Sequence, residues 1–135
     1  MRVRGDRGTG LVASFAGLTV VILFMTFAAQ VLLSLYATST VRATLHDAAS
    51  RAADQRTGQP NLGALATQAE ASLGEMGDRT SITLQLLDED GDGAADVVVG
   101  HAVAIPPGVV PPSIGGMIGF DHIDVSVRVR IERLR

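Results

Sequence analysis

The sequence lacks several residue types, and each absence excludes a class of site. Cysteine is missing from all 135 residues, so the chain has no disulfide framework, thiol nucleophile or cysteine-ligated zinc. Tryptophan is missing too, and aromatic residues make up only 4% of the chain, which argues against a surface for stacking nucleic-acid bases. The formal net charge of −3 gives no attraction to phosphate backbones. We therefore expect no nucleic-acid partner.

Catalytic signatures are also missing. The chain contains no G-x-S-x-G nucleophile turn and no GxxxxGK[ST] phosphate loop. His46, His101 and His122 are scattered along the sequence without the spacing of metal ligands or of a base with its partner. We therefore expect a protein that is not an enzyme.

Charge is absent from a long stretch near the N-terminus. No charged side chain occurs between Gly8 and Val41, and Thr9–Ala29 by itself supplies the roughly 20 apolar residues that cross a bilayer. Arg2, Arg4 and Arg7 precede this stretch, which predicts a cytoplasmic N-terminus and an exported C-terminal part. A cleaved signal peptide has a shorter apolar region, of about 7–15 residues. The sequence therefore favours a permanent single-pass anchor in the cell membrane.

Helix-breaking residues are missing after the apolar stretch. Neither glycine nor proline occurs between Leu18 and Arg56, which predicts one helix from about Gly10 to Asp54. Its second half is amphipathic, because apolar residues recur there at spacings of three and four: Leu33, Ala37, Val41, Leu45, Ala48 and Ala52. We interpret residues 1–8 as a basic cytoplasmic leader, 9–37 as the transmembrane part of this helix, 38–55 as its amphipathic extension and 56–135 as a small exported domain.

The rest of the chain predicts a short helix and three strands. Asn61 can cap a helix that Gly77 would close. Apolar and polar residues alternate from Ile82 to Leu86 and from Ile123 to Ile131, and a valine run begins another strand that ends near Ile105. The proline-rich segment IPPGVVPPSIGG predicts a loop before the last strand. The expected fold is α+β and pilin-like, with a three-stranded antiparallel sheet packed on the long helix.

An acidic run, DEDGDGAAD, separates the first two predicted strands. Asp88, Asp90, Asp92 and Asp96 match the opening of an oxygen-ligand calcium loop, and a glycine supplies its turn. The match ends at the twelfth position, because Val99 stands where an EF-hand has a bidentate glutamate. Asp-Gly pairs are also preferred in hairpin turns. Two interpretations therefore remain open: a hairpin turn without metal, and a weak calcium site.

The N-terminal pattern resembles the TadE/TadG-like family, the pseudopilin-like minor components of tight-adherence (Flp-type) pilus machinery, in an actinobacterial form. The residues that carry the resemblance are RGTGLVASFAGLTVVILFMTFAAQ and, after it, ATSTVRATLHDAASRAAD. It covers residues 5 to about 55, and beyond them only the architecture is similar. The resemblance implies a membrane-inserted, non-enzymatic component of a pilus or related secretion apparatus. Its expected partners are membrane lipid, other pilin-like subunits, the assembly platform and a prepilin peptidase.

The same resemblance implies a processing site. In processed members, a prepilin-type peptidase cuts after a glycine at the cytoplasmic edge of the helix, and Gly8 matches that position, leaving Thr9 first. Such prepilins usually carry a glutamate as the fifth residue after the cut, whereas this chain has Ala13 there. The departure favours an initiating, tip or accessory role over that of a bulk pilus subunit.

Two other functions compete with this interpretation. The chain can be a single-pass envelope protein that never enters a filament and presents a small binding domain, with or without bound calcium. It can also be a secreted binding domain that signal peptidase releases by a cut near Tyr36 to Thr38. Each of the three functions predicts a different first residue for the native protein.

Overall fold

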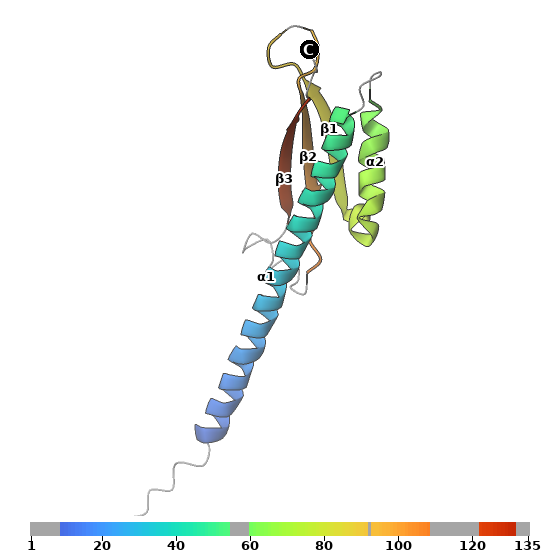
Figure 1. Ribbon diagram of the computed structural model, residues 1–135. Coiled ribbons are helices and arrows are strands. Elements are labelled where there is room, and N and C mark those ends of the chain that lie inside the picture. The colour runs from blue at the N-terminus through green and yellow to red at the C-terminus, as the bar shows by residue number, and fades with distance from the viewer. Residues whose placement is uncertain (1–8, 55–59, 92, 109–121, 132–135) are drawn as a thin grey trace, which may run out of the picture.

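The computed structural model describes residues 9–54, 60–91, 93–108 and 122–131. Its longest element is α1, a single α-helix from Thr9 to Asp54, which confirms the predicted long helix (Figure 1). At about 1.5 Å per residue, this helix is roughly 69 Å long. The sheet and the second helix lie along its C-terminal half only, and its N-terminal half projects away from them. The molecule is therefore a rod with a folded domain on one end.

A second helix, α2 (Leu62–Ser72), follows a turn and contacts both α1 and the sheet. Asn61 caps it as predicted, since its Oδ1 accepts a hydrogen bond from the Ala64 amide at 3.0 Å. The prediction that Gly77 closes this helix is wrong. Gly74, at φ +60°, supplies the left-handed residue just after the helix end, and a 3₁₀ segment, η1 (Gly74–Arg79), then leads into the sheet.

Gly77 has a different function. A Cβ atom built at this position meets the backbone carbonyl oxygen of Glu70 at far less than van der Waals distance. The glycine therefore lets η1 fold back against the last turn of α2.

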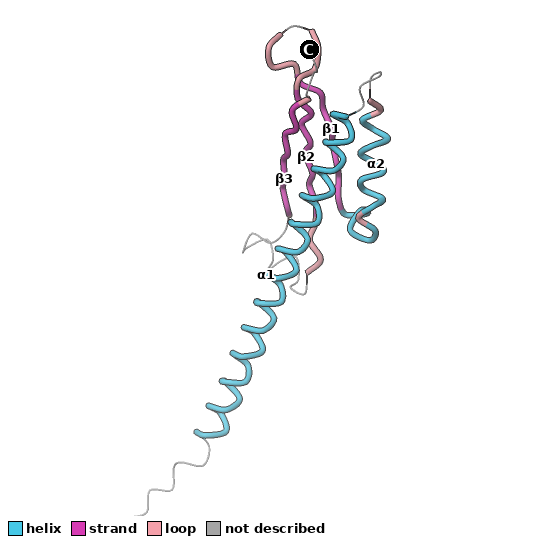
Figure 2. Tube along the Cα trace, viewed as in Figure 1, coloured by secondary structure: helices cyan, strands magenta, loops and turns pink. Residues whose placement is uncertain are grey.

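The sheet is an antiparallel meander of three strands, β1 (Thr80–Leu87), β2 (Val97–Ala104) and β3 (Ile123–Arg130), in the order β1-β2-β3 (Figure 2). All three strands were predicted. The prediction of β1 and β3 rested on alternating side chains, which have one buried and one exposed face, and that of β2 on the valine run at its start. Of the predicted proline-rich loop after β2, residues 109–116 lie outside the described part of the chain.

The core lies between the sheet and the predicted apolar stripe of α1. Leu45, Val41 and Val98 are the largest fully buried side chains. Alanines above and below them on α1 let the helix approach the sheet closely: Ala37, Ala48, Ala49 and Ala52. The closest approach is at Gly100 in the central strand, where a Cβ atom would lie 2.9 Å from Cδ1 of Leu45. The C-terminal half of α1 is therefore one layer of the folded domain and not a flexible linker to it.

The outer edge of β1 is covered by α2. Glu70 of α2 accepts a hydrogen bond from the Ile82 amide through Oε1 at 2.7 Å, in a partly buried position. Ile82 pairs with Ala102 on its other side, so the carboxylate satisfies a strand amide that faces away from β2. The α+β fold with a sheet packed on the long helix is thus as predicted, and this contact fixes the second helix against it.

Candidate membrane anchor and acidic turn

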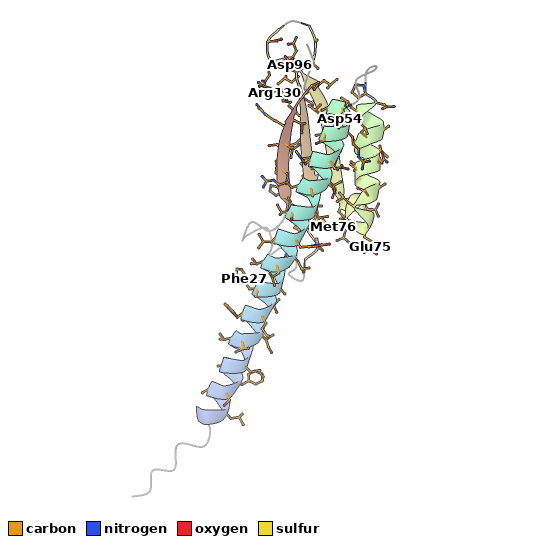
Figure 3. The ribbon with its side chains drawn as sticks, in the orientation of Figure 1. Phe27, Asp54, Glu75, Met76, Asp96 and Arg130 are labelled. Carbon is orange, nitrogen blue, oxygen red and sulfur yellow. The ribbon has the colours of Figure 1, made fainter. Side chains whose placement is uncertain are left out.

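The N-terminal half of α1 exposes apolar side chains on every side (Figure 3). Its exposed large side chains are Leu11, Val12, Phe15, Leu18, Val20, Val21, Ile22, Leu23, Phe24, Met25 and Phe27. An exposed apolar surface of this extent marks contact with lipid or with other protein. The helix is long and apolar enough to cross a membrane, and the most apolar part of it lies outside the folded core. It is a candidate membrane span, although a signal sequence has the same properties.

Hydroxyl groups in this segment are compatible with apolar surroundings. Thr19 donates to the carbonyl of Phe15 at 2.9 Å, and Thr26 donates to the carbonyl of Ile22 at the same distance. A threonine that hydrogen-bonds to its own helix leaves no free donor in the hydrocarbon layer. The two threonines therefore do not oppose membrane insertion.

The exposure of α1 changes at Gln30, a residue whose burial the sequence did not indicate. Gln30 is only 2% exposed, and Ala37 and Val41 further along are fully buried. From here on the helix has one face against the domain. Its opposite face remains apolar for less than two more turns, through Leu32, Leu35 and Tyr36, which are all more than 60% exposed.

The acidic turn lies at the far end of the sheet, between β1 and β2. The carboxylates of Asp88, Asp90 and Asp96 come together, with one oxygen of each lying within 4.8 Å of the others. Asp92, the fourth predicted ligand, lies outside the described residues. Three of the four predicted aspartates therefore belong to one cluster, and such a set of oxygen atoms suits a hard cation such as calcium.

Hydrogen bonds also explain this turn without a metal. The two carboxylate oxygens of Asp88 accept the amides of Gly91 and Gly93, at 2.7 and 2.8 Å respectively. Both glycines have positive φ, +75° and +85°, which other residues rarely adopt. The glycines of the acidic run are therefore required by the turn itself, whether or not the carboxylates hold an ion.

Arginine side chains of β3 lie near acidic side chains of this turn. Arg130 lines a hollow together with Asp90 and Asp96, and Figure 3 shows Asp96 and Arg130 close together. Arg128 approaches Glu89 at 4.0 Å, a long and solvent-exposed ion pair. The Arg130 guanidinium group therefore offsets part of the negative charge that a cation at the cluster would otherwise neutralise. The hairpin turn and the weak calcium site both remain predictions.

The predicted processing site lies at the start of α1. Gly8 is outside the described residues, and Thr9 is the first residue of the helix. Ala13, at the place of the usual prepilin glutamate, is exposed on the apolar half. A cut after Gly8 would leave the whole of α1 attached to the domain.

Comparison with family models, with curated proteins and with solved structures found no match for this chain.

Proposed function

We propose that this protein is a non-enzymatic, TadE-like minor pilin component of a tight-adherence pilus or related secretion apparatus. One observation carries the proposal: a single helix, Thr9–Asp54, has an exposed apolar half and a half buried in a folded domain. The exposed half requires an apolar environment, and the buried half joins it rigidly to the domain. A filament subunit that is stored in the membrane needs both properties: an apolar segment that stays in lipid and a rigid connection from that segment to its folded domain.

The apolar half can be covered in two ways. Lipid covers it while the protein is in the membrane, and the apolar halves of neighbouring subunits can cover it in an assembly. Both environments are apolar, so the transfer between them involves little change in hydrophobic free energy. Because α1 continues without interruption into the domain, a movement of the apolar half carries the domain with it.

The charges that flank the helix support an orientation with the N-terminus in the cytoplasm. Arg2, Arg4 and Arg7 precede it, and the next charged residue is Arg42. The arginine bias favours a cytoplasmic N-terminus, which puts the sheet and α2 outside the membrane. Ala13 in place of a glutamate supports an accessory or initiating role, because it has no carboxylate to pair with the N-terminal amine of a neighbouring subunit.

The experiment that tests this proposal is mass spectrometry of the native N-terminus from the producing cell. A start at Thr9 supports prepilin-type processing, whereas an intact Met1 favours a fixed anchor. A start near Tyr36 to Thr38 would show secretion and overturn the proposal. The structure gives a reason to expect otherwise, since that segment lies inside a continuous helix and Ala37 within it is fully buried.

Filament membership needs a second measurement in cells. The chain has no cysteine, so one introduced at Phe15 on the apolar half is a unique cross-linking site. We expect Phe15→Cys to cross-link to other pilin-like subunits or to the assembly platform. A cysteine at Leu87, which is exposed on the domain, is the matched control. Equal yields at the two positions would speak against specific packing of the apolar half.

An envelope-anchored binding domain outside any filament is the second candidate. The three clustered carboxylates are the observation that favours it, because their oxygen atoms suit a calcium ion that would stabilise a small domain. This candidate predicts an intact Met1 and no cross-linking at Phe15. Its calcium-bound form also predicts that calcium raises the free energy of unfolding of the domain, whereas its calcium-free form does not.

A further inference from the structure

The exposed face of α1 changes from apolar to polar at a sharp boundary. Every large exposed side chain from Leu11 to Tyr36 is apolar or aromatic. After Tyr36, the next exposed positions are Ser39, Arg42 and Ala43, so no large apolar side chain follows on this face. The boundary lies above the start of the domain contact, because Gln30 is already buried.

The length of this apolar face can be compared with a bilayer. From Leu11 to Tyr36 the helix rises roughly 38 Å, at about 1.5 Å per residue. The hydrocarbon core is about 30 Å thick, and the bilayer with both headgroup layers is about 40–45 Å. Along the bilayer normal or at a modest tilt, the apolar face is therefore longer than the hydrocarbon core and fits the hydrocarbon plus one headgroup layer.

The end of the sheet where β2 ends and β3 begins, which we call the base of the domain, lies at the same height along α1 as the end of this apolar face. Leu35 and Thr38 of α1 line a common hollow with Pro106, after β2, and Ile123, at the start of β3. Ile105, next to Pro106, is 57% exposed, and Val103 on the same side of β2 is 38% exposed. Both side chains lie on the face of the sheet that points away from α1, so apolar groups are also exposed on that side of the domain, near the level where the apolar face of the helix ends.

Charged groups set a limit to how deep this base can lie. Arg79 lies beside Ile105, because its backbone carbonyl accepts a hydrogen bond from the Ile105 amide at 3.0 Å. Asp124, near the start of β3, is a second charged residue at this end of the sheet, and its side chain is exposed. Charged side chains are unfavourable in hydrocarbon but tolerated among lipid headgroups. The mixture at the base therefore suits the headgroup layer and not the hydrocarbon.

We propose that the domain does not stand clear of the membrane but lies with its base in the outer headgroup layer, with Tyr36, Leu35 and Ile105 in contact with lipid. The proposal depends on the membrane anchoring proposed above. Tyr36 is suited to this depth, because its ring is apolar and its hydroxyl can reach water or headgroups.

The chain offers a direct test, since Tyr36 is its single tyrosine and it has no tryptophan. The full-length protein is reconstituted in vesicles of phosphatidylcholine and phosphatidylglycerol whose acyl chains carry bromine near the headgroup or near the bilayer centre. Bromine quenches tyrosine fluorescence on contact. In a Tyr36→Phe background, Phe24→Tyr reports on the span, Ile105→Tyr on the base and Leu87→Tyr on the far end of the sheet. All three substituted residues are exposed apolar side chains, so the fold should tolerate each substitution.

We expect shallow bromine to quench Tyr36 and Ile105→Tyr strongly, by at least half, and deep bromine to quench Phe24→Tyr more than either. Leu87→Tyr should keep its fluorescence, because Leu87 is paired with Val97 at the opposite end of the strands from Ile105. If Tyr36 and Ile105→Tyr behave like Leu87→Tyr while Phe24→Tyr is quenched, the anchor stands and the proposal about the base is overturned. An unquenched Phe24→Tyr would instead overturn the membrane anchor itself. Quenching of Tyr36 that disappears as the protein-to-lipid ratio rises would assign this surface to a second copy of the chain and overturn the proposal.

Discussion

The packing of Leu45 against Gly100 gives the sharpest prediction about how the domain depends on α1. Leu45 is fully buried, and a Cβ atom at Gly100 would lie 2.9 Å from its Cδ1 and 3.1 Å from its Cγ. Leu45→Ala removes the side chain and leaves a cavity, so we expect a loss of about 2–5 kcal/mol in the free energy of unfolding. Gly100→Ala overfills the same contact, and we expect a loss of about 1–3 kcal/mol.

The double variant separates this contact from general damage. In Leu45→Ala/Gly100→Ala, the new methyl group occupies part of the cavity that the leucine leaves. We therefore expect the double variant to be less destabilised than the sum of the single variants, by more than about 0.5 kcal/mol. Two residues that do not touch would give additive losses.

The assay is urea unfolding of the full-length protein in detergent micelles, followed by circular dichroism, with hydrogen exchange of the β2 amides as a second readout. Val103→Ala is the matched control, because Val103 lies on the same strand but is 38% exposed on the other face. If Leu45→Ala destabilises the sheet no more than Val103→Ala does, α1 is not part of the core and the reasoning is refuted.

Four further predictions concern the contacts around the sheet and the acidic turn. Glu70→Ala leaves the Ile82 amide without its acceptor and should destabilise the domain by about 1–3 kcal/mol in the same unfolding assay, while Glu70→Gln should lose less. Gly77→Ala forces a Cβ atom into the Glu70 carbonyl, so we expect poor expression of folded protein and a lowered Tm. Asp88→Ala removes the acceptor of two glycine amides and should destabilise the domain by about 1–2 kcal/mol in calcium-free buffer. The hairpin interpretation predicts no calorimetric heat on adding millimolar calcium, and heat that Asp90→Ala abolishes would establish a cation site instead.

The helix and the strands could be predicted because their patterns are strong and local. The uncharged run that starts at Thr9, and the absence of glycine and proline from Leu18 to Asp54, permit little else than one long helix. The alternation from Ile123 to Arg130 likewise fixes which face of β3 is buried. Both patterns depend on near neighbours in the sequence, and tertiary contacts did not override them.

The errors and omissions involve contacts between distant residues. Either Gly74 or Gly77 can end a helix by composition, and only the close approach to Glu70 distinguishes their functions. The position of Gly100 opposite Leu45 depends on how α1 crosses the sheet, which no local pattern encodes. No sequence pattern indicated that Gln30 is buried, since an amide in an apolar run can face either the domain or the surroundings of the helix.

The candidate sites were predictable to different degrees. The calcium-loop pattern named Asp88, Asp90, Asp92 and Asp96, and the structure brings the carboxylates of Asp88, Asp90 and Asp96 together, while Asp92 lies outside the described residues. The same pattern could not reveal that Asp88 already accepts two amides or that Arg130 lies near the cluster. The apolar length of α1 was evident from the sequence, but the overlap between its exposed face and the base of the domain required the structure.

The continuity of α1 through the boundary at Tyr36 is the claim on which the rest depends, and a distance between two spin labels measures it directly. Leu18→Cys and Ala43→Cys lie below and above the boundary, at exposed positions on the same side of the helix, in a chain with no other cysteine. A continuous helix predicts one narrow population near 38 Å, at about 1.5 Å per residue, in micelles and in bilayers alike. A broad distribution that extends to much shorter distances would show a break near Tyr36 and contradict the account.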